Sequence, residues 1–238
     1  MAGIRLDKLL SKSGFGSRTD VKKMIAARRV TVCGTVVTDS GQKAEEADVL
    51  VDGKPILYQE YIYLLMNKPK GVLSSTEKRG VPTVVDLIAD KYKKYEPFPV
   101  GRLDIDTEGL LLITNDGPLA HELLSPKKHV DKTYYAEIDG FVTEEDVFLF
   151  SRGVDIGEKA LTRPAKLEIL ESGETSKVYI TICEGKFHQI KRMFHAVGKS
   201  VTYLKRVRMG TLTLPDDLKC GSYMEIPCPF VQNAQKNS

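Results

Sequence analysis

The fold of this chain is decided by residues 101–117, which read GRLDIDTEGLLLITNDG. A polar loop there passes directly into the apolar run from Gly109 to Thr114, which predicts a buried strand. Residues 115–117 are a turn signal, and Pro118 can start a short helix that runs through Leu124. We therefore expect a strand, a turn and a short helix here, with an acidic loop in front of the strand.

The alternation of strands with short helices continues outward from this stretch. Tyr61 to Met66 predicts an apolar strand that ends in a turn at residues 67–71. Two further strands are expected, from Lys132 to Ile138 and from Val178 to Ile182. Thr143 can cap a helix that begins with three acidic side chains. These patterns predict an α+β fold with a mixed, mainly antiparallel sheet.

The composition is that of a globular protein of one to two domains. The chain has 238 residues, of which 42% are apolar and 28% are charged, so a disordered or fibrous chain is excluded. Its longest apolar runs fall far short of the roughly 18 residues that a membrane-spanning helix needs, and the basic N-terminus has no secretory h-region. We expect a cytoplasmic protein without a membrane partner.

The four cysteines indicate neither a metal site nor a redox site. They are scattered along the chain without any C-x-x-C pair, which excludes a zinc ribbon and a thioredoxin-like motif. The expected state of Cys33, Cys183, Cys220 and Cys228 is therefore the reduced thiol.

Positive charge is concentrated in two segments of a nearly neutral chain. The net charge is only +3, from 35 basic and 32 acidic residues. Residues 1–29 nevertheless carry eight basic and two acidic side chains, and residues 186–214 carry seven basic side chains and no acidic one. Two such segments suggest a polyanion that is bound at two places.

The first basic segment has the pattern of two amphipathic helices. Leu6, Leu9 and Leu10 lie at helical spacing on one face, and basic side chains lie on another. Ser17 and Asp20 form a capping-box pattern for a second helix, and short β-branched runs follow it. On the helices alone, a solvated surface and an RNA-binding face are equally good interpretations.

This N-terminal pattern resembles the S4 RNA-binding domain. The resemblance lies in RLDKLL at residues 5–10, GSR at 16–18, RVTV at 29–32, and in Ile25 and Gly34. It covers about the first 55 residues, and we expect an S4 domain at residues 1–58. Because the family binds structured RNA through its paired helices, the resemblance implies RNA contacts by Arg5, Lys8, Arg18, Lys22 and Arg29.

Three carboxylates lie within five residues, directly before the apolar strand of residues 109–114. They are Asp104, Asp106 and Glu108. A carboxylate at the mouth of a buried strand is partly desolvated, which raises its pKa unless a cation such as Arg102 keeps it ionised. This is a suitable place for a nucleophile or a general base, although acidic loops are more often solvated turns. The loop lacks the Asp-x-Asp-x-Asp-Gly pattern of a calcium site.

The second basic segment predicts a helix with one apolar and one basic face. Ile190, Phe194 and Val197 share a face, and Gly198 is a suitable C-cap. The side chains that gather elsewhere on this helix, and can offer cations to phosphates, are His188, Lys191, Arg192 and His195. The two histidines have no third ligand nearby in the sequence, so we expect no metal site here.

Lys132 and Tyr134 share one face of a predicted strand, and Tyr135 lies on the other. An exposed aromatic ring beside a lysine is a natural stacking platform for a nucleobase. Aromatic residues in strands more often serve packing, so this pattern alone is weak.

Together these stretches resemble the pseudouridine synthases, specifically the RsuA-type family that carries an N-terminal S4 domain. The matching motifs are residues 67–71, 101–104, 107–114, 132–134 and 185–193, in the family's order and approximate spacing. The resemblance implies a synthase domain at residues 61–230, followed by a polar tail at 231–238. It implies an enzyme that breaks the N-glycosidic bond of a uridine in RNA and rejoins the base through carbon, with no cofactor or metal.

The resemblance also implies roles for individual residues. Asp104 matches the family's essential aspartate, and Tyr134 matches the tyrosine that packs on the target base, which must be flipped out of the folded RNA. Lys186 stands where many relatives have Arg and is expected to pair with Asp104, with Lys191 as the competing candidate. The further residues expected to bind substrate are Arg102, Lys132, His188, Gln189, Ile190, Lys191 and Arg192. Attack of Asp104 on the ribose, attack on the uracil and removal of a sugar proton remain open routes.

The stretch HQIKRMFHAVG at residues 188–198 is similar to the corresponding stretch in the branch of the family that acts on small-subunit ribosomal RNA. We therefore expect a monomeric enzyme whose target is one uridine of 16S ribosomal RNA in a partially assembled small subunit. The alternatives are a 23S ribosomal RNA target, a non-catalytic RNA-binding ribosome-assembly factor, and a nucleoside hydrolase that pairs Asp104 with Asp106 or Glu108. Loop carboxylates two residues apart rarely face each other across a substrate, which disfavours the hydrolase.

Overall fold

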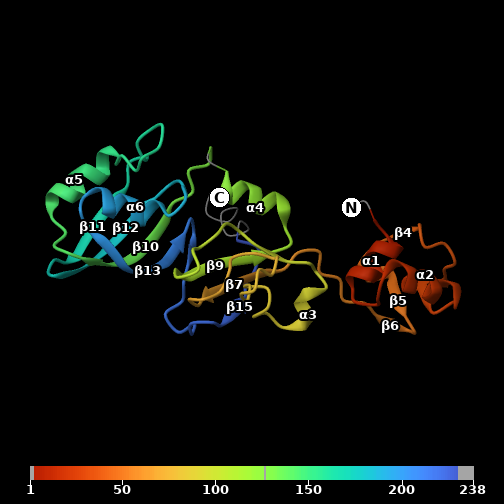
Figure 1. Ribbon diagram of the computed structural model, residues 1–238. Helices are drawn as coiled ribbons and strands as arrows, with labels where there is room; N and C mark the ends of the chain where they lie inside the picture. The colour runs from red at the N-terminus through yellow and green to blue at the C-terminus, as the bar shows by residue number, and fades with distance from the viewer. Residues whose placement is uncertain (1–2, 126, 230–238) are drawn as a thin grey trace. The chain divides into compact units, whose positions relative to one another are not determined.

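The computed structural model describes residues 3–125 and 127–229, and Figure 1 shows the chain as a ribbon. The chain divides into two compact units. The first comprises Met1–Ile62 and Asp90–Glu96, and the second comprises Tyr63–Ala89 and Pro97–Ser238. Every helix in the described part of the chain is too short or too polar to cross a membrane. The polar tail expected at residues 231–238 lies outside the described residues.

The first unit packs two short helices on small antiparallel sheets. Its elements are β1 (Ile4–Arg5), α1 (Leu6–Lys12), α2 (Arg18–Ala26), β2 (Val30–Val32), β3 (Thr35–Val36), β4 (Lys43–Ala44), η1 (Glu46–Asp48), β5 (Val49–Val51), β6 (Lys54–Pro55) and α3 (Asp90–Lys93). The expected capping box at the start of α2 is present, because Ser17 and Asp20 each accept a hydrogen bond from the other's amide. Leu6, Leu9 and Leu10 are fully buried in the core of this unit, as their helical spacing predicts.

The second unit is built on one large mixed sheet. Its strands are β7 (Tyr63–Lys68), β8 (Phe98–Pro99), β9 (Glu108–Thr114), β10 (Lys132–Asp139), β11 (Lys166–Glu171), β12 (Thr175–Ile182), β13 (Ser200–Met209), β14 (Leu212–Thr213) and β15 (Tyr223–Glu225). Their order is β11-β12-β10-β13-β9-β7-β15, with β14 on β13 and β8 on β9. The pairing of β13 with β9 is parallel and the other pairings are antiparallel. The expected α+β fold with a mixed, mainly antiparallel sheet is confirmed.

Three helices of this unit were predicted from the sequence. They are α4 (Gly117–Leu124), α5 (Glu144–Arg152) and α6 (Gln189–Ala196), and two of them, α4 and α5, begin at the predicted start signals. Asp116 caps α4 by accepting from the Leu119 amide at 3.0 Å, and Thr143 caps α5. In Figure 1, α5 and α6 lie together over the part of the sheet formed by β10, β11 and β12. Contact between the rings of Phe150 and Phe194, with centroids 4.9 Å apart, joins the two helices.

A single glycine sets how closely the two halves of this sheet approach each other. Gly109 of β9 lies opposite Arg206 of β13 and has a φ angle of +101°. A Cβ atom at this position would lie 2.3 Å from the carbonyl oxygen of Arg206, so no other residue fits. The acidic loop at residues 101–107 leads into β9 at this point, and it is thereby placed next to β13.

Candidate active site

A buried lysine holds the acidic loop. Lys68, the last residue of β7, is fully buried, and its Nζ donates to the carbonyl oxygens of Pro69 (3.0 Å), Asp104 (3.1 Å) and Thr107 (2.9 Å). Burial lowers the pKa of Lys68 to about 8, although the nearby charge of Asp104 opposes this effect. Lys68 therefore ties both ends of the turn that carries Asp104 to a central strand.

Two further contacts fix the backbone on either side of Asp104. The Ser74 hydroxyl donates to the Leu103 carbonyl at 3.0 Å and accepts from the Leu103 amide at 3.1 Å. On the other side, the Gly71 amide donates to the Ile105 carbonyl at 2.8 Å. The side chain of Asp104 remains 29% exposed. The loop thus presents the Asp104 carboxylate from a turn whose backbone is held on both sides.

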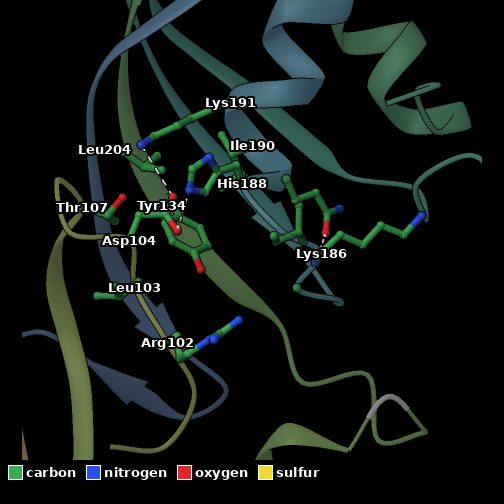
Figure 2. Close-up of a pocket in the computed structure, with 13 residues that line it drawn as sticks. Arg102, Leu103, Asp104, Thr107, Tyr134, Lys186, His188, Ile190, Lys191 and Leu204 are labelled. Atoms are coloured by element: carbon green, nitrogen blue, oxygen red, sulfur yellow. Dashed lines mark hydrogen bonds and ion pairs between the residues drawn. The ribbon is translucent and has the colours of Figure 1, made fainter. Parts of the chain in front are cut away.

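Asp104 faces two basic side chains from the start of α6 (Figure 2). Lys191 Nζ lies 3.5 Å from its Oδ2, and His188 Nε2 lies 3.6 Å from its Oδ1. Lys191 also donates to both carboxylate oxygens of Asp106, at 2.6 and 2.7 Å, and this contact lowers the pKa of Asp106. One ammonium group therefore stabilises the negative charge of two carboxylates.

Lys186 does not reach Asp104, contrary to the expectation from the sequence. Its Nζ lies 3.4 Å from Glu158 Oε2 and within 3.4 Å of the carbonyl oxygens of Ala160 and Leu161. Figure 2 shows the Lys186 side chain pointing away from Asp104. The chain changes direction at His188, which has the left-handed backbone conformation with φ at +49° just before α6. The register of α6 then brings Lys191, the competing candidate, to Asp104.

The three loop carboxylates have different surroundings. Asp106 is bound to Lys191, and Glu108 accepts from the Tyr203 hydroxyl at 2.8 Å. Asp104 lines the cavity in Figure 2, and Asp106 and Glu108 do not. Within the described residues, no group of three His, Cys, Asp or Glu side chains is arranged to hold a metal ion. The geometry does not provide the facing carboxylates that a hydrolase would need.

Tyr134 and Asp104 both line a cavity of about 90 Å³ (Figure 2). The Tyr134 side chain is 7% exposed, so the ring is recessed and does not form the open platform that the strand pattern suggested. Buried Ile190 and Leu204 add an apolar wall. Tyr135 lies on the other face of β10, where its ring packs edge-on against Tyr179. The two tyrosines therefore lie on opposite faces, as the alternation predicts.

A wider recess of about 440 Å³ adjoins this cavity and shares Arg102, Asp104 and Tyr134 with it. Lys132, two residues before Tyr134 on β10, also lines the recess. Burial lowers the pKa of Lys132, and the positive charge of Arg206 acts in the same direction. The structure thus brings Arg102 and Lys132 to the site, as expected.

Two residues expected to bind substrate are engaged within the protein. Gln189 is buried, and its amide group accepts from the Lys186 backbone and donates to Glu184, both at 2.9 Å. Arg192 pairs with Glu158 at 2.8 Å and also donates to the Ile156 carbonyl. Both side chains brace the segment that leads into α6, and a contact of either with RNA remains a prediction.

Lys68 and Arg206 belong to the site, and sequence reasoning missed both. Lys68 ends a strand in which every residue is buried, so a lysine there must find polar partners inside the protein. Arg206 lies on β13, a strand that the sequence analysis did not predict, because three charged residues interrupt its apolar pattern. Once β13 is paired with β10, Arg206 lies opposite Tyr134 on the site face.

The basic residues expected to bind RNA in the first unit lie on or next to its helices. Arg5 pairs with Asp7 at 3.0 Å, and Arg29 pairs with Asp52. Arg5 and Arg29 remain exposed despite these pairs. Lys8 on α1 is half-buried, and Arg18 and Lys22 on α2 are exposed. Contact of these five side chains with RNA stays a prediction.

Comparisons with known proteins agree with this geometry. The model of the family described as RNA pseudouridylate synthase matches residues 62–196, and that of the S4 domain matches residues 4–50. An uncharacterized RNA pseudouridine synthase of Bacillus subtilis is 49% identical over 227 residues, which cover 94% of this chain and 95% of the relative. The ribosomal small subunit pseudouridine synthase A of Escherichia coli is 40% identical over 223 residues, which cover 92% of this chain and 95% of the relative. A crystal structure of a pseudouridylate synthase matches with a TM-score of 0.66 and 33% identity, covering 94% of this chain and 96% of that chain.

Proposed function

This chain belongs to the RNA pseudouridylate synthase family and carries an S4 domain, and we propose that it converts one uridine of 16S ribosomal RNA to pseudouridine. The enzyme class follows from the family. The target is taken from relatives whose names assign them to the small ribosomal subunit, among them those of Escherichia coli and Yersinia pestis, which match more than nine-tenths of the chain. The observation that carries the activity is the position of Asp104, which lines one cavity with Tyr134 and lies beside Lys191.

Asp104 is the residue to which we assign the reaction. A base flipped out of folded RNA can lie against Tyr134 in the cavity that the Asp104 carboxylate also lines. The carboxylate can attack the ribose, attack the uracil or remove a sugar proton. In each route the N-glycosidic bond breaks and a carbon atom of the same base bonds to the ribose, so the net reaction gains and loses no atoms.

Lys191 and Lys68 support Asp104 in different ways. Lys191 stabilises the negative charge of the carboxylate from 3.5 Å, and it takes the role for which Lys186 was the first candidate. Lys68 acts on the backbone of the turn and not on the carboxylate. We assign Lys191 to the charge of the reacting group and Lys68 to its position.

RNA affinity is assigned to both parts of the chain. Residues 1–58 serve as the S4 RNA-binding domain, and residues 61–230 as the catalytic domain with a second basic surface. The proposed enzyme is monomeric and cytoplasmic, and it acts on a small subunit that is still partially assembled, where the target uridine is exposed. Its partner is then ribosomal RNA, and the reaction proposed here calls for no cofactor.

The decisive experiment is to map pseudouridines in both ribosomal RNAs from cells with and without this gene. The purified enzyme is then offered free 16S RNA, partially assembled small subunits and 23S RNA. We expect the loss of one pseudouridine from 16S RNA, and its restoration by the enzyme in vitro. Loss of a 23S pseudouridine with an unchanged 16S pattern would refute the 16S target. Unchanged patterns in both RNAs, without conversion in vitro, would favour the non-catalytic alternative.

A further inference from the structure

The wider recess beside the active site carries positive charge that the protein itself does not neutralise. Arg102, Lys132, Lys186 and Arg206 line it, together with the acids Asp104 and Glu184. Of the four cations, Lys186 is paired with Glu158, which leaves the charge of Arg102, Lys132 and Arg206. Both acids have other partners: Asp104 lies beside Lys191 and His188, and Glu184 accepts hydrogen bonds from the Arg163 amide and from the side chain of Gln189. The recess is therefore suited to an anion.

Arg206 shows this most directly. It is 2% exposed, and its Nε donates to the Leu110 carbonyl at 2.8 Å. Its Nη2 is buried and has no hydrogen-bond partner among the residues that the structure describes. A buried guanidinium donor without an acceptor is costly, because the group has lost its water and gained nothing in return. An anion in the recess would supply the missing acceptor.

Lys132 is the second charge that points to an anion. Its pairing in β10 puts it on the same face as Tyr134, which lies directly opposite Arg206 in β13. The Nζ of Lys132 donates to the Val130 carbonyl at 2.9 Å. Buried Arg206 and half-buried Lys132 lie on one face of adjacent strands, and the pKa of Lys132 is lowered first by burial and then by the positive charge of Arg206. A group with negative charge between them would turn their repulsion into attraction.

The size and surroundings of the recess indicate which anion fits. A phosphate group offers several acceptor oxygens to a planar guanidinium and a point charge to an ammonium group. The recess adjoins the cavity of Asp104 and Tyr134, so its ligand would lie next to the flipped base. We propose that Arg206 and Lys132 form a seat for one backbone phosphate of the substrate RNA, directly adjacent to the target uridine. This inference rests on the proposed function, because it takes an RNA substrate as given.

The seat would also let Arg206 help to select a flipped nucleotide over a stacked one. A phosphate held beside Tyr134 fixes the position of the ribose relative to Asp104, so it favours a nucleotide whose base has left the stack. Phosphate contacts position a nucleic acid without reading its bases. The seat would therefore act on any flipped nucleotide, and the choice of uridine would fall to the cavity itself.

The test combines a protein variant with a change in one phosphate. Stem-loop RNAs are built around the uridine that the wild-type enzyme modifies, with an uncharged methylphosphonate at either the 5′ or the 3′ phosphate of that uridine. Affinity is measured with the Asp104→Asn chain, which prevents turnover, alone and combined with Lys132→Met. Lys205→Met is the matched control. It removes the same charge from the same sheet, but Lys205 lies opposite Tyr135 on the other face.

We expect Lys132→Met to weaken binding of the unmodified RNA about tenfold and to reduce the salt slope by about 1, as for the loss of one phosphate contact. One of the two methylphosphonates should weaken binding by the wild-type Lys132 chain about as much. Combining that methylphosphonate with Lys132→Met should weaken binding no more than about twofold beyond either change alone. Lys205→Met should leave the methylphosphonate effect intact. If the losses from Lys132→Met and from the methylphosphonate multiply at both phosphates, the seat is overturned.

Arg206 itself is tested by the more conservative Arg206→Lys, which keeps the charge. We expect it to reduce the effect of the same methylphosphonate, provided that thermal unfolding shows a folded chain. If this variant does not fold, the Lys132→Met cycle decides the question by itself. A target uridine in 23S RNA would refute the proposed function without affecting this test, because the stem-loop is built around whichever uridine is modified.

Discussion

Replacing Lys68 with Met is expected to destabilise the turn at residues 104–107, which carries Asp104, while leaving RNA binding intact. The Lys68 side chain is fully buried and donates to three backbone carbonyls, two of which belong to Asp104 and Thr107. Met has a similar length but no donor, so the three carbonyl oxygens lose this partner. At about 1 kcal/mol for each buried acceptor left unpaired, the lost hydrogen bonds alone should lower the free energy of unfolding by about 3 kcal/mol, and this loss should appear in full near pH 10.5, where the wild-type lysine no longer carries a buried charge.

The same substitution should leave a signature in the pH dependence of stability. Burial lowers the pKa of Lys68 from 10.5 to about 8, so the folded chain releases this proton at lower pH than the unfolded chain. The cost of the buried charge is therefore fully present below pH 8 and is relieved as the pH rises toward 10.5. At 1.36 kcal/mol per pKa unit, the wild type should gain up to about 3 kcal/mol of unfolding free energy relative to the Met variant across this range.

Urea unfolding of both chains between pH 7 and pH 10.5 measures these differences. The matched control is Lys70→Met, which removes the same charge from an exposed position two residues away. Single-turnover formation of pseudouridine should fall about 100-fold in Lys68→Met, with RNA affinity within about twofold of the wild type. Equal unfolding free energies of the wild type and Lys68→Met at every pH would refute the reasoning, as would an equal loss in Lys70→Met.

The remaining predictions concern the reacting group, its cation, the stacked base and the RNA-binding domain. Asp104→Asn should leave folding and RNA affinity unchanged and abolish product, and activity within about tenfold of the wild type, roughly 1.4 kcal/mol of barrier, would contradict its role. Lys191→Met should lower the single-turnover rate about 100-fold, and Lys186→Met less than tenfold; the reverse order would restore the sequence-based assignment. Tyr134→Ala should cost about 1–3 kcal/mol of base stacking while Tyr134→Phe retains it, so equal effects would argue against stacking. Deletion of residues 1–57 should weaken RNA binding and flatten its salt dependence, and an unchanged slope would show that these basic helices do not touch RNA.

Local signals in the sequence were enough to predict four of the nine described strands of the large sheet, β7, β9, β10 and β12, and its three helices α4, α5 and α6. Apolar runs such as that of β9 identify strands because a buried strand needs little else, and the capping boxes of α2 and α5 mark helix starts. Asp104 and Tyr134 could be assigned because each lies in a motif that is contiguous in the sequence. That both line one cavity was implied by the resemblance and not by the local pattern.

Contacts between distant segments were beyond the reach of such signals. The choice between Lys186 and Lys191 depends on a single left-handed residue, His188, and no spacing rule reveals that change of direction. The charged side chains of strand β13 hide its alternating pattern, so Arg206 was predicted only as one charge of the basic segment at residues 186–214 and not as a residue of the site. Lys68 is similar, because two of its three partners are backbone carbonyls nearly 40 positions away, and a carbonyl partner cannot be predicted from residue types.

The position of β15 has a consequence for how the enzyme matures on the ribosome. Asn67, next to Lys68, exchanges backbone hydrogen bonds with Gly221 and Ser222, and its side chain donates to the Leu218 carbonyl, 151 positions away. The helices and the four-stranded sheet of the S4 region are complete by Pro55, whereas the catalytic sheet gains its edge strand only near the end of synthesis. A nascent chain should therefore be able to hold RNA well before it can modify it. A product truncated before Tyr223 would act as an inhibitor of the finished enzyme, because it would occupy the substrate without releasing pseudouridine.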